Sequence, residues 1–166
     1  MEHSIPALVI AAVLIIGGAV IASVMGSSVD TVGDSWRDIN LITEERLGTE
    51  LSVVSTSVGG GGSDISVTIN NSGRTSIYDP SYMDVIINYN GADDERYLLW
   101  VPYTGGALED NTWTVSAVSG DYRNPGVLDP GEEMTIQIRI NPATQDGPDR
   151  WLVISTDTGV TYTIYF

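Results

Sequence analysis

The sequence predicts an α+β fold in which one long N-terminal helix precedes an antiparallel β-sandwich. The chain opens with an almost wholly apolar run, Ile5 to Met25, whereas from Leu51 onward apolar residues recur with a period of two. No strand–helix–strand alternation follows Leu51, which argues against a parallel sheet. The expected domains are therefore 1–50 for the helix and 51–166 for the sandwich.

The apolar run, IPALVIAAVLIIGGAVIASVM, is 21 residues long. As a helix it would measure about 30 Å, the thickness of the hydrocarbon core of a bilayer. Ser4 can cap such a helix, and Pro6 fits its first turn, where a missing N–H costs nothing. The run is thus long enough to span a membrane.

Three interpretations of this run compete: a signal peptide, a permanent anchor, and a helix that is membrane-inserted first and later packs against copies of itself. The flanks favour neither of the first two, because MEHS carries Glu2 without a basic residue and the next basic residue after Met25 is Arg37. Removal of a basic leader from a precursor would explain this start. Small residues such as Gly17 and Gly18 let helix backbones approach closely, which favours the third interpretation; a lone anchor stays open.

After Gly26 the pattern becomes amphipathic, with apolar residues three and four apart, and the helix is expected to continue to about Glu50. Gly33 would cost it about 1 kcal/mol relative to alanine. So long a helix cannot bury its whole circumference against one small domain, so lipid before assembly and other helices after it would cover the front half. The residues expected in contact with neighbouring helices are Ile5, Leu8, Ala12, Ile15, Gly18, Ala19, Ala22, Met25, Val29, Val32 and Trp36.

Eight segments in the second half alternate or run apolar, with many β-branched and aromatic residues. Turn signals rich in glycine, proline, asparagine and aspartate separate them, which is typical of an antiparallel, immunoglobulin-like sandwich or a small barrel. The run Gly59–Gly62 is expected to form a hairpin loop or a bulged corner between two strands. The segments are 51–58, 64–70, 83–90, 96–103, 111–118, 133–140, 151–156 and 160–166.

The composition limits the partners and the chemistry. The net charge is −15, from 7 arginines and no lysine against 22 acidic residues, so nucleic acids would be repelled. Acidity without lysine suits a salty environment, but a GC-rich genome produces the same bias. The chain has no cysteine, which excludes disulfides and thiolate metal sites.

No catalytic constellation is apparent, and neither an enzyme activity nor a cofactor is expected. His3 is the single histidine, so no histidine-dependent triad can form. The acidic clusters 93–95, 109–110 and 132–133 lack the spacing of a dedicated calcium loop and are expected to be solvated turns. Trp100, Trp113 and Trp151 are expected in the core, a sugar-binding platform being the alternative. No metal site is predicted.

The sequence Asn70-Asn71-Ser72 is an acceptor pattern for N-glycosylation, which makes Asn70 a candidate modification site at the end of a strand.

The arrangement of a bare apolar helix, Ser4 to Met25, an amphipathic continuation and a C-terminal sandwich resembles the archaellins and archaeal type IV pilin-like proteins. The phrases VTINNSGRTSIYDP and LDPGEEMTIQI also resemble strand-and-turn segments of that superfamily. The resemblance implies a precursor cut by a prepilin-type peptidase, extraction from the membrane by an assembly platform, and a homo-oligomeric helical filament outside the cell with the apolar helices at its axis. The acidic residue lies at Glu2, whereas bacterial type IV pilins carry theirs at the fifth position.

The function expected from these observations is that of a non-enzymatic subunit of an archaellum-like motility filament. Two alternatives remain open at this point: an adhesive archaeal pilus subunit, and a membrane-anchored sandwich that acts as a stator or surface-layer-binding accessory protein.

Overall fold

A computed structural model describes residues 4–166, with the side chains of 4–8, 22 and 25–31 left out of the description. The chain divides into two compact units, one ending at Thr43 and the other comprising Glu44–Phe166. Each is described by itself.

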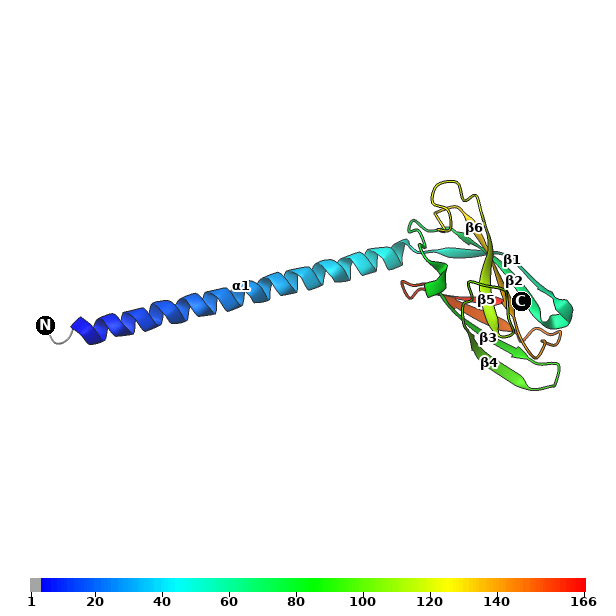
Figure 1. Ribbon diagram of the computed structural model, residues 1–166, viewed down its shortest axis with the longest axis horizontal. Coiled ribbons are helices and arrows are strands. Elements are labelled where there is room, and N and C mark those ends of the chain that lie inside the picture. Colours follow the sequence, from blue (N-terminus) through cyan, green and yellow to red (C-terminus); the bar gives the residue numbers. More distant parts are fainter. Residues whose placement is uncertain (1–3) are drawn as a thin grey trace. The chain divides into compact units, whose positions relative to one another are not determined.

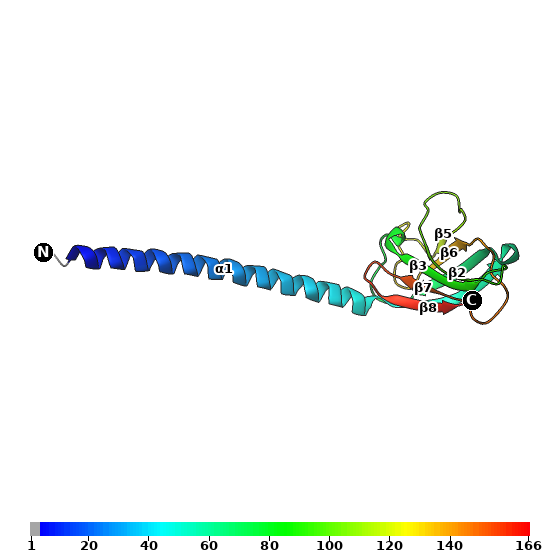
Figure 2. The same ribbon diagram turned by 90° about the horizontal axis from the view of Figure 1, so that it is seen from below.

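The N-terminal unit consists of helix α1, which runs from Ser4 to Gly48 over 45 residues and extends into the second unit. Figures 1 and 2 show it as one uninterrupted coil. The hydroxyl groups of Ser23 and Thr43 donate to backbone carbonyls of their own helix, at 2.8 Å from Val20 and 2.7 Å from Ile39. These polar side chains therefore need no partner from outside the helix.

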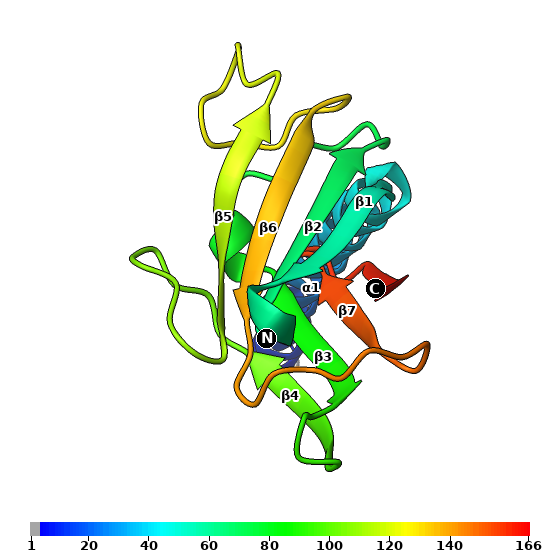
Figure 3. The same ribbon diagram turned by 90° about the vertical axis from the view of Figure 1, so that its right-hand side faces the viewer.

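The second unit contains two antiparallel four-stranded sheets. Figure 3 shows β5, β6, β2 and β1 side by side in the first, and β4, β3 and β7 in the second. Short 3₁₀ turns lie at Gly60–Gly62 and Pro80–Tyr82. The first sheet has the order β1 (Leu51–Gly59), β2 (Asp64–Asn71), β6 (Glu133–Arg139), β5 (Thr112–Ser119), and the second the order β4 (Arg96–Val101), β3 (Asp84–Asn90), β7 (Trp151–Ser155), β8 (Thr161–Tyr165).

The alternation seen in the sequence places every second side chain in one core between the sheets. In β2, residues Ile65, Val67 and Ile69 are buried, while the residues between them are half-exposed. They join buried residues of the opposite sheet, such as Ile87 and Leu152, in one cluster. The predicted α+β class is thus confirmed, and each of the eight predicted segments contains a strand.

Within the second unit, residues 48–50 are hydrogen-bonded to the loop that follows β2. The amides of Gly73 and Arg74 donate to the carbonyls of Glu50 and Gly48, at 2.9 Å and 2.6 Å. A Cβ at position 73 would collide with the backbone of Gly48 and Glu50, so the close approach requires glycine there. The end of α1 and the first strand are therefore held in a defined position on the sandwich.

The buried side chain of Asn71 holds the loop that follows β2 in place through hydrogen bonds. Its Nδ2 donates to the carbonyls of Thr75 and Leu128, at 2.9 Å and 3.0 Å, and its Oδ1 accepts from the amide of Gly73 at 3.1 Å. Its amide hydrogens and its oxygen are thus hydrogen-bonded, as a buried amide requires.

Candidate functional site

Helix α1 exposes its apolar residues. Ile15 is 72% exposed, and its neighbours Leu14 and Ile16 are exposed as well. Nine of the large apolar side chains between residues 9 and 24 are exposed, on all sides of the helix: Val9, Ile10, Val13, Leu14, Ile15, Ile16, Val20, Ile21 and Val24. A helix that is apolar all round is normally buried all round, so its surface calls for a partner from another molecule.

The predicted interface residues follow one stripe along α1, at spacings of three and four. Ala12, Ile15, Gly18, Ala19, Val32 and Trp36 are exposed and therefore available for contact with another molecule. The side chains of the remaining five, Ile5, Leu8, Ala22, Met25 and Val29, lie outside the described part of the chain.

Three glycines of α1, Gly17, Gly18 and Gly33, have no packing role among the described residues. A Cβ built at Gly17, Gly18 or Gly33 would meet nothing within 4 Å. Each glycine costs the helix about 1 kcal/mol relative to alanine, and the described residues contain no neighbour that would need the space. Close approach by another helix would use it.

Among the residues that the structure describes, none of the helical stretches is long and apolar enough to cross a membrane.

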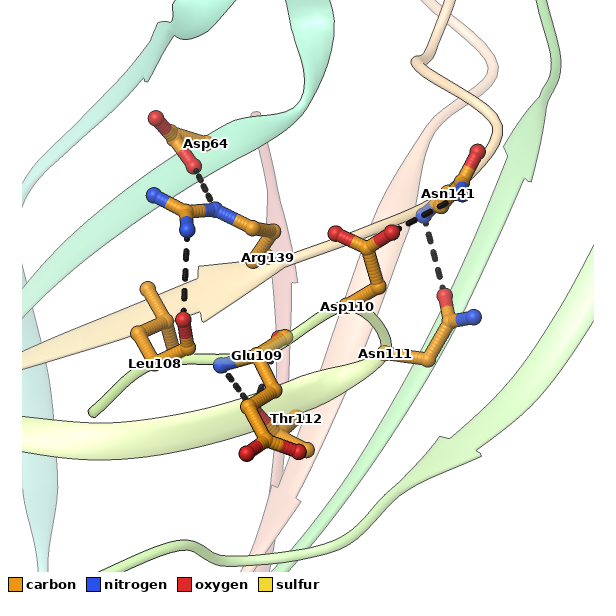
Figure 4. A network of polar contacts seen from close by, with 8 residues as sticks. All are labelled: Asp64, Leu108, Glu109, Asp110, Asn111, Thr112, Arg139 and Asn141. Atoms are coloured by element: carbon orange, nitrogen blue, oxygen red, sulfur yellow. Dashed lines mark hydrogen bonds and ion pairs between the residues drawn. The ribbon is translucent and has the colours of Figure 1, made fainter. Parts of the chain in front are cut away.

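A polar network on the sandwich connects the segment before β5 to the ends of β2 and β6 (Figure 4). The guanidinium of Arg139 donates from Nε to Oδ1 of Asp64 at 2.7 Å and from Nη1 to the carbonyl of Leu108 at 3.2 Å. The bond to Asp64 raises the pKa of Arg139. Nearby, Asn141 donates from Nδ2 to Asp110 at 2.9 Å and from its amide to Asn111 at 3.0 Å.

This network ties the segment before β5 to the ends of β2 and β6. A pocket of about 180 Å³ lies beside it, lined by Asp64, Leu108, Arg139 and residues of β1, β2 and β6. Its one carboxylate, that of Asp64, is paired with the guanidinium of Arg139. In the described residues no three acidic or histidine side chains gather in a way that could hold a metal ion.

The acidic turn 93–95 is exposed, as the sequence predicts, but its carboxylates also have defined partners. Oδ2 of Asp93 accepts from the hydroxyl of Tyr97 at 2.6 Å, which lowers the pKa of Asp93 and raises that of Tyr97. Asp94 accepts from Nε2 of Gln145 at 2.6 Å and has a φ of 66°. Sequence reasoning missed both contacts; that to Gln145 joins segments 51 residues apart.

The three tryptophan predictions have different outcomes. Trp151 is only half-buried and lies on the outer face of β7, where Leu152 and Ile154 point inward, so its assignment to the core was wrong. Trp113 is fully buried, so its assignment to the core is confirmed. Trp100 is 61% exposed, so its assignment to the core was wrong. The physical reason is the alternation of β4, an edge strand in which Leu99 and Val101 point inward and Trp100 points outward.

Asn70, the candidate glycosylation site, is half-buried at the end of β2. Its Nδ2 donates to the carbonyls of Gly131 and Glu132 at 3.3 Å and 3.2 Å. Attachment of a glycan replaces one of the two hydrogens on this nitrogen, so modification of the folded domain would break at least one of these contacts and displace the loop 131–132. The assignment stays a prediction.

The chain thus combines a helix that exposes apolar side chains with a domain that has a closed core. The sequence matches the archaeal-type flagellin family over residues 2–166, and the chain belongs to that family. It is therefore a structural subunit of an archaellum-type filament, and the family is one of structural proteins and not of enzymes.

The solved structures agree with this assignment at the level of the fold. The archaeal flagellum of Methanospirillum hungatei strain JF1 is similar over 97% of this chain and 90% of that chain, with a TM-score of 0.63 and 13% identity. The archaellum periplasmic stator complex of FlaF and FlaG from Sulfolobus acidocaldarius is similar over 71% of this chain and 89% of that chain, with a TM-score of 0.54 and 23% identity. A comparison with curated protein sequences finds no match.

Proposed function

We propose that this subunit polymerises by bundling its apolar helices at the axis of an extracellular filament, with the sandwich outside. The observation that carries the proposal is the exposure of apolar side chains on every side of α1 between Val9 and Val24. If each subunit removes on the order of 1,000 Å² of this surface from water, the gain is roughly 25 kcal/mol before the entropy of association is subtracted.

The stripe from Ile5 to Trp36 is proposed as the contact surface of this bundle, with Gly18 and the alanines as points of closest approach. Residues 1–50 would act as the filament-core segment and 51–166 as the outer domain. The two functional parts would then meet close to Leu51, where the last turn of α1 is fastened to the sandwich.

A precursor that is held in the membrane, cut by a prepilin-type peptidase and handed to an assembly platform would supply such helices. Membership of the archaeal-type flagellin family supports this route. In the proposed sequence of events, lipid covers the apolar helix first, and neighbouring helices replace lipid during assembly.

We further propose that the sandwich is of the immunoglobulin-like type. The strand order supports this: read along the chain as A, B, C, C′, D, E, F and G, the sheets become A-B-E-D and C′-C-F-G.

Negative-stain electron microscopy of material sheared from the cell surface, with gold-labelled antibody against residues 51–166, tests the filament. The expected result is continuous labelling of filaments along their length. Recovery of the chain only as single copies in detergent-extracted membranes would favour a second candidate function, that of a membrane-anchored stator-like protein. This candidate is considered because the fold is similar to that of the FlaF and FlaG complex.

Motility is proposed over adhesion because the family is that of flagellins. Deleting the gene and scoring swimming against surface attachment separates the two. Loss of swimming with unchanged attachment is the expected outcome, and the reverse would identify an adhesive pilus.

A further inference from the structure

The outer face of the second sheet is apolar and aromatic, in contrast to that of the first sheet. On the first sheet the outward positions of β2 and β6 are polar, including Ser66, Thr68 and Gln137. On the second sheet the exposed side chains include Leu98 (63%), Trp100 (61%) and Tyr165 (69%).

The strand register brings these residues into two adjoining rows. One row crosses the sheet as Trp100, Ile86, Val153 and Thr163, and the next as Leu98, Asn88, Trp151 and Tyr165. Aromatic side chains carry about 150–250 Å² each, so Trp100 and Tyr165 each leave roughly 100 Å² or more in water. With Leu98 and Ile86 added, the patch reaches a few hundred Å², the size at which exposed apolar surface marks an interaction site.

The face is also electrically neutral within a very acidic chain. The outward positions of β3, β4, β7 and β8 carry one negative and one positive side chain, Asp84 and Arg96, so they sum to zero, whereas the whole chain carries −15. Both charges are engaged: Arg96 donates to Oδ1 of Asn88 at 2.6 Å, and Asp84 accepts from Nε1 of Trp100 at 3.0 Å.

The bond from Trp100 to Asp84 holds an exposed indole in place. A pre-oriented tryptophan loses little side-chain freedom on binding, and tryptophan is among the residues that most often dominate binding energy at interfaces. The patch is thus built like the centre of a contact surface and unlike a solvated sheet face.

We propose that this aromatic face, with Leu98 and Trp100 on the edge strand β4 and Tyr165 on the opposite edge strand β8, is the surface through which the sandwich of one subunit contacts a second copy of this chain in the filament. The proposal rests on the proposed helical bundle. Two copies that each carry −15 repel one another over most of their surface, whereas on this face the carboxylate of Asp84 is balanced by Arg96, so the contact area has no net charge.

The area of the aromatic face determines how strong a contact it can make between two subunits. It is smaller than the roughly 800 Å² per partner of a stable interface, so it does not hold free subunits together. Bundled helices fix neighbouring sandwiches close to one another, and this raised local concentration makes a weak contact effective. The contact therefore exists in the filament and stiffens its outer layer.

Thiol labelling tests the proposal cleanly because the chain has no cysteine. The variant Leu98→Cys is assembled into filaments and treated with a maleimide. The labelling rate of its cysteine is then divided by the labelling rate of the same variant unfolded in urea, which serves as the fully accessible reference. Tyr122→Cys, at a loop position that is 92% exposed in the wild type, reports whether the reagent reaches the filament. The expected result is labelling at position 98 at least tenfold slower than at position 122.

Equal labelling of the two variants in intact filaments would overturn the contact, while the filament itself would stand. Absence of filaments from the wild type would instead contradict the proposed function. A second measurement covers the case in which Leu98→Cys fails to assemble: Trp100→Ser filaments should dissociate at a lower temperature than wild-type filaments, and Tyr122→Ser filaments should not. Equal dissociation temperatures for all three would also overturn the proposal.

Discussion

Helix α1 and the sandwich place their apolar residues in opposite ways. In the sandwich the large apolar side chains of both sheets lie in one closed core. In α1 every large apolar side chain described between Val9 and Val24 is exposed. The difference shows that the sandwich buries its apolar residues within one chain, whereas the apolar surface of the helix is left open within its own unit.

The largest expected effect comes from placing a carboxylate on the helix. Ile15→Asp or Gly18→Glu should abolish filament assembly, because each buries an unpaired charge in a dry bundle and no arginine occurs between Ser4 and Met25 to meet it. Filament yield after shearing, compared by immunoblot with precursor in the membrane fraction, measures this. Normal yield of either variant would mean that its position lies outside the bundle.

A substitution in the core should lower the stability of the sandwich and leave the apolar surface of helix α1 unchanged. Trp113→Ala should lower the free energy of unfolding by about 3–5 kcal/mol, since it empties a fully buried site. Trp113→Phe is the matched control; its cost should be smaller, because Nε1 of Trp113 is buried without a hydrogen-bond partner. Urea unfolding followed by circular dichroism of the β signal compares them, and equal losses for both would contradict the core assignment.

The polar network around Arg139 should contribute less to the stability of the sandwich than the core residue Trp113 does. Arg139→Met removes the contacts to Asp64 and Leu108, but both charged side chains are partly exposed, so the expected loss of stability is small. Proteolysis should detect it more readily than unfolding does, through faster cleavage in the loop 102–111. Unchanged cleavage would show that the guanidinium does not hold this loop.

The smallest effect is expected in the acidic turn. Asp94→Ala should assemble normally, because the carboxylate is exposed and bonded only to Gln145. The positive φ at this position costs alanine more than aspartate or glycine, so Asp94→Gly is the better neutral control. The midpoint of thermal unfolding of Asp94→Gly should be equal to or higher than that of Asp94→Ala. A lower midpoint for Asp94→Gly would contradict the role given to the positive φ.

The strands could be predicted from the sequence because alternation and turn residues are local signals. Each predicted segment contains a strand, and the boundaries differ by up to two residues, as at β4, which ends at Val101 and not at position 103. The outward placement of Trp100 was missed because alternation fixes two faces of a strand and does not say which one meets the core. A bulky aromatic residue on an edge strand was therefore assigned to the wrong face.

The candidate surface on the helix could likewise be predicted, because a long apolar run is visible without a structure. The contacts that fasten the end of the helix could not. They join Gly48 and Glu50 to Gly73 and Arg74 across the whole of β1 and β2, and a sequence pattern does not reveal which turn will meet which helix end. The aromatic face was missed for the same reason, since it depends on the pairing of four strands.

The most direct test of the central claim is a cryo-electron microscopy reconstruction of filaments sheared from cells that express this chain. The account predicts a dense bundle of helices along the axis in which Ile15 and Gly18 contact neighbouring copies, surrounded by sandwiches. Sandwiches joined to one another around an axis without helical density, or helices that remain exposed to solvent, would contradict it.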